Sequence, residues 1–103
     1  MSSLILNDSN FTKEVKLSEK PVVLVEFYGK WNDDSMNAIQ YLDEISEELD
    51  YVKVCRMDAD ESPKITARYG ILTVPTFLVF HNAQIVNMQI GALTKDDIKN
   101  MVL

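Results

Sequence analysis

The period of the apolar residues changes after Tyr28, and this change predicts the central strand and the longest helix of the chain. Val22–Tyr28 is a run of β-branched and aromatic residues whose one charge is Glu26, which is typical of a strand buried on both faces of a sheet. Beyond it, apolar residues recur every three or four positions, as on one face of a helix, at Met36, Ile39, Leu42, Ile45 and Leu49. We therefore expect a strand that turns into a helix running from about Asp33 to about Leu49.

Shorter apolar runs on either side predict the remaining elements. Turn-forming residues separate these runs from one another. The expected strands are Leu4–Leu6, Tyr51–Met57, Phe77–His81 and Ile85–Ile90. The expected short helices carry Phe11 and Val15, Ile65 and Tyr69, and Ile98, Met101 and Val102. Because the strand that begins near Tyr51 follows a helical crossover, it should lie parallel to the central strand.

Residues that cap helices mark three helix starts. Asn32–Ser35 supplies acceptors for the free N–H groups at the start of the long helix. Ser62 and Pro63 suit the N-cap and the first position of a short helix. Thr94 and Asp97 have the spacing of a capping box at the start of the last helix.

Charge and length limit the classes of function. The chain has 103 residues, which predicts one domain over residues 1–103, and its formal net charge is −6. Sequence-independent binding to nucleic acids requires a basic protein surface. The chain has no cluster of lysine or arginine, so we expect no nucleic-acid partner. No apolar run is long enough to span a membrane. The first residues lack the basic start and apolar core of a secretory signal, so we expect a cytoplasmic protein without a membrane partner.

Residue types that bind metals or transfer electrons are sparse. Cys55 is the one cysteine, which excludes an internal disulfide and an all-cysteine metal cage, and its place in a strand predicts a buried, structural thiol. His81 has no metal-binding partner at a suitable spacing. The spacing of four aspartates fits no calcium loop: Asp33, Asp34, Asp58 and Asp60. We therefore expect neither a metal nor a cofactor.

Four segments resemble those of one known family. The central strand and its turn read V-E-F-Y-G-K-W followed by N-D-D-S, and later segments read A-R-Y-G-I, T-V-P-T-F and I-G-A-L-T-K. In order and spacing they resemble the thioredoxin family, which has V-D-F-W-A-x-W leading into W-C-G-P-C, then x-K-Y-G-I, x-[IV]-P-T-hydrophobic and V-G-A-L-S-K. The resemblance covers nearly the whole chain. It implies an α/β thioredoxin fold, a central mixed β-sheet flanked by helices in the order β-α-β-α-β-α-β-β-α.

Both cysteines of the family motif are absent. Asn32 and Ser35 stand at their positions, so there is neither an attacking thiolate nor a resolving thiol, and we expect no catalytic residue. Asp33 and Asp34 would disfavour a thiolate at position 32, and as charges they suit a helix start. A helix cap is therefore the favoured interpretation of Asn32–Ser35. The alternatives are that these residues form a surface adapted to contact a partner, or that two cysteines were replaced in the laboratory.

The resemblance also implies a charge pair under this site. The family has a buried Asp at the position of Glu26, which assists proton transfer to the resolving cysteine, and a paired Lys at the position of Arg56. With no thiol to serve, Glu26 and Arg56 are expected to form a structural ion pair, buried or half-buried. Removal of one partner would then strand the charge of the other.

The surface on which family members bind extended peptides is the remaining candidate site. The resemblance implies a cis bond before its loop proline and places the groove at Trp31, Asp33, Asp34, Thr73, Val74, Pro75, Gly91 and Ala92. Such binding depends on main-chain hydrogen bonds and apolar pockets, and it requires no cysteine. The alternative is that Pro75 and Gly91 only maintain the fold.

Three functions follow from these interpretations. The first is a thioredoxin-fold binding or scaffold module without redox catalysis, whose partner is a protein or an extended peptide. The second is a protein-disulfide oxidoreductase of cell redox homeostasis, which acts through Cys55 or is represented here by a cysteine-substituted form. The third is a holdase-like chaperone that uses the same groove.

Overall fold

The computed structural model describes residues 2–103, and its elements follow the order predicted from the sequence. The first helix is a short π-helical turn, named η1. The elements are β1 (Leu4–Leu6), η1 (Thr12–Lys16), β2 (Val22–Tyr28), α1 (Asp33–Glu48), β3 (Val52–Asp58), α2 (Pro63–Arg68), β4 (Thr76–His81), β5 (Gln84–Ile90) and α3 (Lys95–Met101). No helix in this part of the chain is long and apolar enough to cross a membrane.

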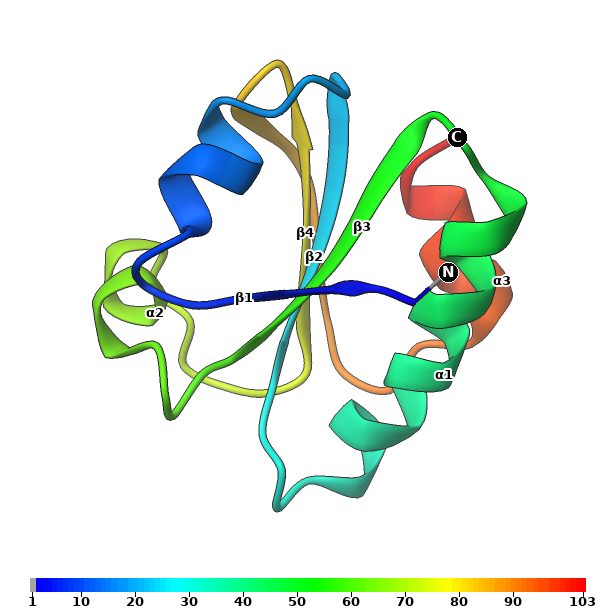
Figure 1. The fold of residues 1–103 in the computed structure, drawn as a ribbon. Helices are drawn as coiled ribbons and strands as arrows, with labels where there is room; N and C mark the ends of the chain where they lie inside the picture. Colours follow the sequence, from blue (N-terminus) through cyan, green and yellow to red (C-terminus); the bar gives the residue numbers. More distant parts are fainter. Residues whose placement is uncertain (1) are drawn as a thin grey trace.

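Five strands form one mixed sheet in the order β1-β3-β2-β4-β5 (Figure 1). β3 lies parallel to both β1 and β2, whereas β4 runs antiparallel to β2, and β5 antiparallel to β4. Because α1 carries the chain back across the sheet, β3 can return parallel to β2. The mixed sheet flanked by helices is therefore confirmed.

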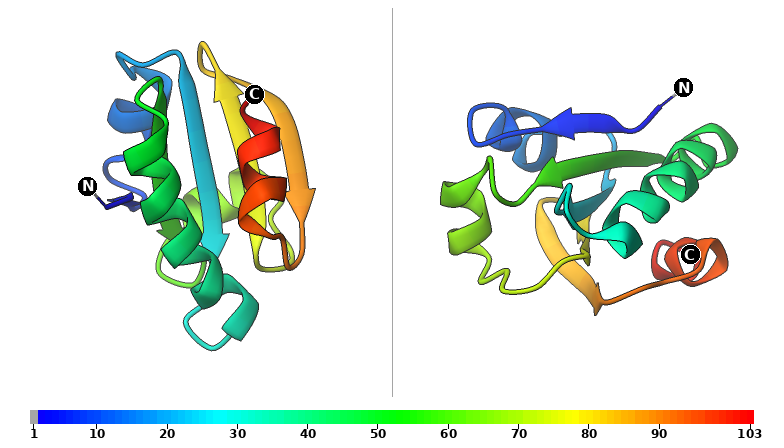
Figure 2. Two further views of the ribbon diagram at one scale, coloured as in Figure 1. Left: turned by 90° about the vertical axis from the view of Figure 1, so that its right-hand side faces the viewer. Right: turned by 90° about the horizontal axis from the view of Figure 1, so that it is seen from below.

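Helices cover both faces of the sheet, and each face has its own core. α1 and α3 lie on one face, and η1 and α2 lie on the other (Figures 1 and 2). The core under α1 and α3 includes Leu24, Leu42 and Phe77. The core under η1 and α2 includes Phe11 and Phe27. β2 contributes to both cores, as its nearly continuous apolar run predicts.

The carboxyl ends of β2 and β3 lie at the same end of the sheet, where the candidate site is located. β2 ends at Tyr28 and turns into α1, and β3 ends at Asp58 and turns into α2. The carbonyl of Tyr28 accepts the N–H of Ala59 at 2.9 Å, which joins the two turns. The loop between α2 and β4 also reaches this end (Figure 1). In open α/β sheets, ligands bind beyond the carboxyl ends of parallel strands.

Hydrogen bonds determine where the predicted elements end. α1 ends at Glu48, one residue before the expected end. β3 begins at Val52, whose N–H donates to the carbonyl of Leu49 at 3.3 Å. At the start of α3, the predicted capping box of Thr94 and Asp97 is confirmed, since each side chain accepts the other residue's N–H. The apolar pattern therefore predicts each element to within about a residue or two.

The start of α2 is capped by a side chain from a distant segment. Ser62 is the N-cap residue, as expected, but its hydroxyl is buried and has no hydrogen-bond partner among the described residues. The carboxylate of Asp8 instead accepts the N–H groups of Lys64, at 3.1 Å, and Ile65, at 2.9 Å. The prediction that the Ser62 side chain caps this helix is therefore wrong. A charged acceptor makes the stronger hydrogen bonds at a helix start.

Candidate functional site

Asn32 caps α1 as its residue type predicts. Its side-chain oxygen accepts the N–H of Ser35 at 2.8 Å, and its own N–H donates to the carbonyl of Gly29 at 3.0 Å. The backbone of Asn32 is extended, with φ −109° and ψ 116°, as is usual for an N-cap residue. Position 32 therefore carries a hydrogen-bond acceptor that serves the helix, where the family motif has a nucleophile.

Gly29 allows Trp31 and Val74 to approach the end of β2. A Cβ atom at position 29 would lie 2.7 Å from Nε1 of Trp31 and 3.2 Å from Cγ2 of Val74. The first distance is shorter than non-bonded heavy atoms tolerate, so a larger residue would displace the indole. Trp31 nevertheless stays 70% exposed, and its Nε1 donates to Oδ2 of Asp60 at 3.1 Å. The sequence interpretation did not include Gly29 or Asp60 in the site.

The loop before β4 is held by hydrogen bonds on both sides of Pro75. The peptide bond between Val74 and Pro75 is cis. The hydroxyl of Thr76 donates to the carbonyl of Thr73 at 2.7 Å, and the N–H of Gly91 donates to the carbonyl of Pro75 at 3.0 Å. Gly91 has φ +107°, an angle that residues with a Cβ rarely adopt. These contacts hold the backbone of Thr73 and Val74 in place at the end of the sheet.

A cavity beside Trp31 brings three of the predicted groove residues together. Its volume is about 340 Å³, and it is lined by Trp31, Ala59, Asp60, Thr66, Ile71, Leu72, Thr73 and Val74. Leu72 is 94% exposed, so with Trp31 it provides an uncovered apolar surface at the cavity. The sequence did not identify the other five lining residues, among them Ala59, Asp60 and Thr66. The signal was available for Ala59 and Asp60, because they directly follow β3 and the carboxyl ends of parallel strands meet.

Five other predicted groove residues do not line this cavity. Asp33 and Asp34 are exposed in the first turn of α1, where their charges suit the helix dipole. Pro75 is buried, Gly91 is half-buried and Ala92 is exposed. The structure therefore brings only Trp31, Thr73 and Val74 of the predicted groove together at one cavity.

The acidic residues after β3 are used in the turn itself. Oδ1 of Asp58 accepts the N–H groups of Asp60, at 2.9 Å, and Glu61, at 3.3 Å. Nζ of Lys30 lies 2.9 Å from Oε2 of Glu61 and 3.8 Å from Oδ2 of Asp58. Within residues 2–103, no group of three or more His, Cys, Asp or Glu side chains is placed to hold a metal ion.

Glu26 is buried without a hydrogen-bond partner. Its side chain is fully buried, and neither carboxyl oxygen has a partner among the described residues. Burial raises the pKa of Glu26 to about 9, and the positive charge of Arg56 opposes this shift only in part. Glu26 is therefore a neutral acid at pH 7. The buried hydroxyl of Ser35 also has no partner among the described residues, so two unsatisfied polar groups lie beneath the site.

Glu26 and Arg56 do not form the predicted ion pair. The two residues are register partners on β2 and β3, but Nη1 of Arg56 lies 3.7 Å from Oδ1 of Asp43 and donates to Oγ of Ser3 at 3.1 Å. Asp43 is on α1 and is more exposed than Glu26. Pairing with this carboxylate costs less desolvation than a fully buried pair would. The resemblance implied the positions of Glu26 and Arg56 but could not identify Asp43.

Cys55 is a structural residue, as predicted. Its side chain is fully buried in the core under η1 and α2, and burial raises the pKa of the thiol to about 12. A reactive cysteine requires access to solvent and a lowered pKa. Cys55 therefore has neither property of a redox-active thiol.

Comparisons with known proteins agree with the fold and the motifs. A family model described as Thioredoxin matches residues 2–103. The thioredoxin of Rickettsia prowazekii (strain Madrid E) is 38% identical over 98 residues, which are 94% of this chain and 92% of that protein. Thioredoxin 1 of Nostoc sp. (strain PCC 7120) is 35% identical over 91 residues, covering 87% of this chain and 84% of that protein.

A solved structure shows the same fold. A mutant thioredoxin from Halobacterium salinarum NRC-1 superimposes with a TM-score of 0.89, at 24% sequence identity, over 98% of this chain and 88% of that chain. At this identity the likeness concerns the fold, whereas the family model and the curated relatives concern the sequence itself. The chain belongs to the thioredoxin family.

Proposed function

We propose that this chain is a thioredoxin-fold binding or scaffold module that docks an extended segment of a protein partner beside Trp31 and does not catalyse disulfide exchange. The proposal rests on a difference between two parts of the site. Asn32 and Ser35 are joined in a helix cap, while Trp31 and Thr73 line an open cavity. We place this module in the cytoplasm, as the sequence predicts.

The absence of suitable thiols argues against redox catalysis. Disulfide exchange requires an accessible thiolate and a second thiol that resolves the mixed disulfide. Position 32 carries an amide, and position 35 carries a buried hydroxyl. The thiol of Cys55 is buried and its pKa is raised to about 12, so it cannot replace the missing pair.

The cavity has the features that bind an extended peptide. Trp31 and Leu72 supply exposed apolar surface, which a partner side chain would cover. The backbone N–H groups of Thr73 and Val74 donate to no acceptor within residues 2–103. Carbonyl groups of a peptide in extended conformation can accept from such donors, as in β-strand addition.

A peptide titration tests this proposal directly. The probe is an acetylated and amidated peptide of alternating valine and threonine, without charged residues. Because Trp31 is the one tryptophan, its fluorescence reports on the cavity. We expect a saturable fluorescence change, and we expect Leu72→Glu to weaken binding roughly tenfold.

Leu17→Glu is the matched control, because Leu17 is also a well-exposed leucine but does not line this cavity. We expect this variant to bind the uncharged peptide as the original chain does. Constant Trp31 fluorescence, together with unchanged amide resonances of Thr73 and Val74, would count against the proposed site.

The names of the relatives favour a protein-disulfide oxidoreductase as the second candidate. The two candidate functions predict different rates of insulin reduction in the presence of dithiothreitol. The binding module predicts the rate of the reductant alone. A rate above this background, lost on alkylation of the unfolded protein, would support the oxidoreductase.

A further inference from the structure

The outer edge of β3 is open over the first half of the strand. β2 pairs with β3 along its whole length, whereas β1 pairs only with Cys55–Met57. On the side of β1, Val52, Lys53 and Val54 therefore have no neighbouring strand among the described residues. An open edge of this kind is a template for a further strand.

Contacts of Ser3 explain why β1 does not cover this edge. Leu4 pairs with Cys55, so a strand continued toward the N-terminus would place Ser3 opposite Val54. Instead, the N–H and the hydroxyl of Ser3 both donate to Oδ1 of Asp43 on α1, each at 2.8 Å. Ser3 is accordingly held against α1. These two partly buried hydrogen bonds hold Ser3 away from the edge of β3.

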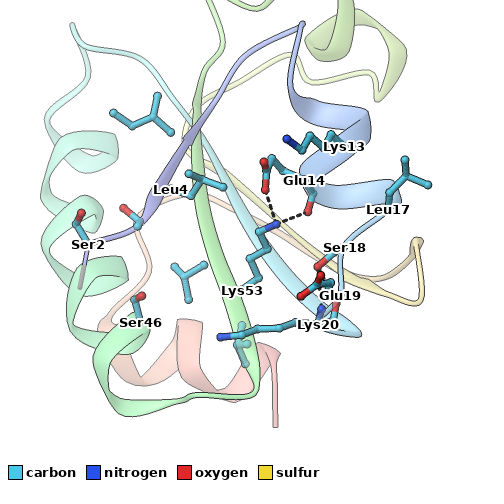
Figure 3. A pocket seen from close by; sticks show the side chains of 14 residues that line it. Ser2, Leu4, Lys13, Glu14, Leu17, Ser18, Glu19, Lys20, Ser46 and Lys53 are labelled. Carbon is cyan, nitrogen blue, oxygen red and sulfur yellow. Dashed lines mark hydrogen bonds and ion pairs between the residues drawn. The ribbon is translucent and has the colours of Figure 1, made fainter.

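A groove runs along the open edge between α1 and η1 (Figure 3). Its volume is about 830 Å³, with Ser46 on the α1 side, Leu17 on the η1 side and Val52–Val54 between them. It is more than twice as large as the cavity beside Trp31. Exposed apolar side chains flank it, since Leu17 is 72% and Ile5 is 55% exposed. A strand that occupied the groove would remove this apolar surface from water.

The charges of the groove favour an acidic occupant. Its charged lining residues are three lysines and two glutamates: Lys13, Lys20, Lys53, Glu14 and Glu19. The groove therefore has a local charge of +1, whereas the whole chain has a net charge of −6. Nζ of Lys53 is engaged, because it lies 2.6 Å from Oε1 of Glu14 and donates to the Glu14 carbonyl at 2.9 Å. The ammonium groups of Lys13 and Lys20 make no hydrogen bond within residues 2–103, although the charge of Lys13 contributes to lowering the pKa of Glu14. These two groups remain available to carboxylates of a partner.

We propose that this groove docks an extended, acidic segment of a partner protein, which adds as a strand beside Val52–Val54. Main-chain hydrogen bonds to the open edge of β3 supply the pairing beyond Val52, whose N–H already donates to the carbonyl of Leu49. Apolar side chains of the segment cover Leu17 and Ile5, and its carboxylates approach Lys13 and Lys20. This site is separate from the cavity beside Trp31, so the chain can hold two segments at once.

The test uses an acetylated and amidated peptide in which valine and threonine alternate between terminal glutamates. Titrated into ¹⁵N-labelled protein, it should shift the amide resonances of Val52–Val54 and Leu17 saturably. We expect Leu17→Glu to weaken binding roughly tenfold at low salt, and the double variant Lys13→Glu with Lys20→Glu to do the same. Leu72→Glu, at the other cavity, should bind as the original chain does.

Two altered peptides separate strand addition from charge alone. N-methylation of alternate backbone amides preserves the side chains but removes donors, and we expect it to abolish binding. Terminal lysines in place of glutamates should weaken binding roughly tenfold. Circular dichroism verifies that each protein variant is folded.

Several results would overturn the proposal. One is a set of shifts confined to Trp31 and Thr73 or to β5, with none at Val52–Val54. The others are unchanged affinity of Leu17→Glu or of the double lysine variant for the peptide, and unchanged affinity of the original chain for either altered peptide. Sedimentation of the unliganded chain as a dimer that excludes the peptide would identify a second copy as the occupant, which also overturns it.

Discussion

The first turn of α1 and the loop before β4 lie at the same end of the sheet, but they preserve different parts of the family site. In the first turn, the side chain of Asn32 binds the N–H of Ser35, and no thiol is present. In the loop, backbone groups hold the arrangement, since Gly91 donates to Pro75. The first turn lacks the two cysteines of the family motif, whereas the loop is held in place by contacts of its own backbone.

The proposed function rests on this difference, because it assigns peptide binding to a part of the site that is separate from the two positions of the cysteine motif. Nucleophilic chemistry requires one particular side chain, so a single substitution removes it. Backbone geometry depends on many contacts, among them those of Gly29, Thr76 and Gly91. Loss of both cysteines therefore need not disturb the cavity beside Trp31.

Introduction of two cysteines at positions 32 and 35 should have the largest effect on activity. In the double variant Asn32→Cys with Ser35→Cys, the N–H groups at the start of α1 should stabilise a thiolate at position 32. We expect it to reduce insulin disulfides at least roughly tenfold faster than dithiothreitol alone. The turbidity of reduced insulin measures the rate.

The single variant Asn32→Cys is the control, because it lacks the thiol that resolves the mixed disulfide. Further replacement of Asp33 and Asp34 by Gly and Pro should increase the rate, since two carboxylates near a thiolate raise its pKa. A double variant no faster than dithiothreitol would mean that the backbone of this turn has also changed.

Glu26→Leu should produce the largest change in stability. The ordinary pKa of this side chain is 4.5, and in the folded chain burial raises it to about 9. Between these two values the folded chain retains a proton that the unfolded chain releases, so the stability of the original chain falls as pH rises through this window. At pH 7 we expect Glu26→Leu to increase the free energy of unfolding by roughly 1–4 kcal/mol. Urea unfolding at several pH values measures the difference.

The advantage of Glu26→Leu should grow with pH across that window, because only the original chain has the titrating group. A difference that is constant with pH would contradict a buried neutral acid. Combination with Arg56→Met tests the absence of a direct pair. Since Arg56 contacts Asp43, we expect the two substitutions to add to within about 0.5 kcal/mol.

Asn32→Ala should remove the cap of α1. We expect the free energy of unfolding to fall by about 1 kcal/mol, because the N–H of Ser35 loses its acceptor. Thermal or urea unfolding measures this loss. Asn37→Ala is the matched control, since Asn37 is exposed within the same helix and alanine favours helix there. Equal losses from both variants would show that Asn32 acts through helix propensity alone.

Asp33→Asn should have the smallest effect. Asp33 lies in the first turn of α1, where a negative charge stabilises the positive end of the helix dipole. We expect a loss of about 0.3–1 kcal/mol at low salt, and a smaller loss at high salt because the charge is screened. Asp50→Asn removes an exposed carboxylate beyond the other end of α1 and should have no such cost. A loss that does not depend on salt would exclude the dipole as its cause.

The sequence predicted the elements and their order because these depend on local patterns. The apolar run of Val22–Tyr28 and the helical spacing that follows it correspond to β2 and α1. The caps at Asn32 and Thr94 are also local, since each side chain binds an N–H group three residues away. In the candidate site, the resemblance identified Trp31, Thr73 and Val74, which line one cavity.

The errors concern contacts between distant residues. Asp8 caps α2 in place of the Ser62 side chain, and Asp43 pairs with Arg56 in place of Glu26. In both cases a charged group from another element offers a better partner than the sequence neighbour or the register partner does. The apolar pattern has no information about such groups, because they meet only after the sheet and helices pack.

By itself, the sequence determined the order of strands and helices, the helix caps formed by near neighbours, and the absence of a cysteine pair at the start of α1. Only the tertiary structure decided that Glu26 stays uncharged, and that half of the β3 edge is left open. Both outcomes depend on packing, which removes water from a carboxyl group in one place and draws Ser3 toward α1 in the other.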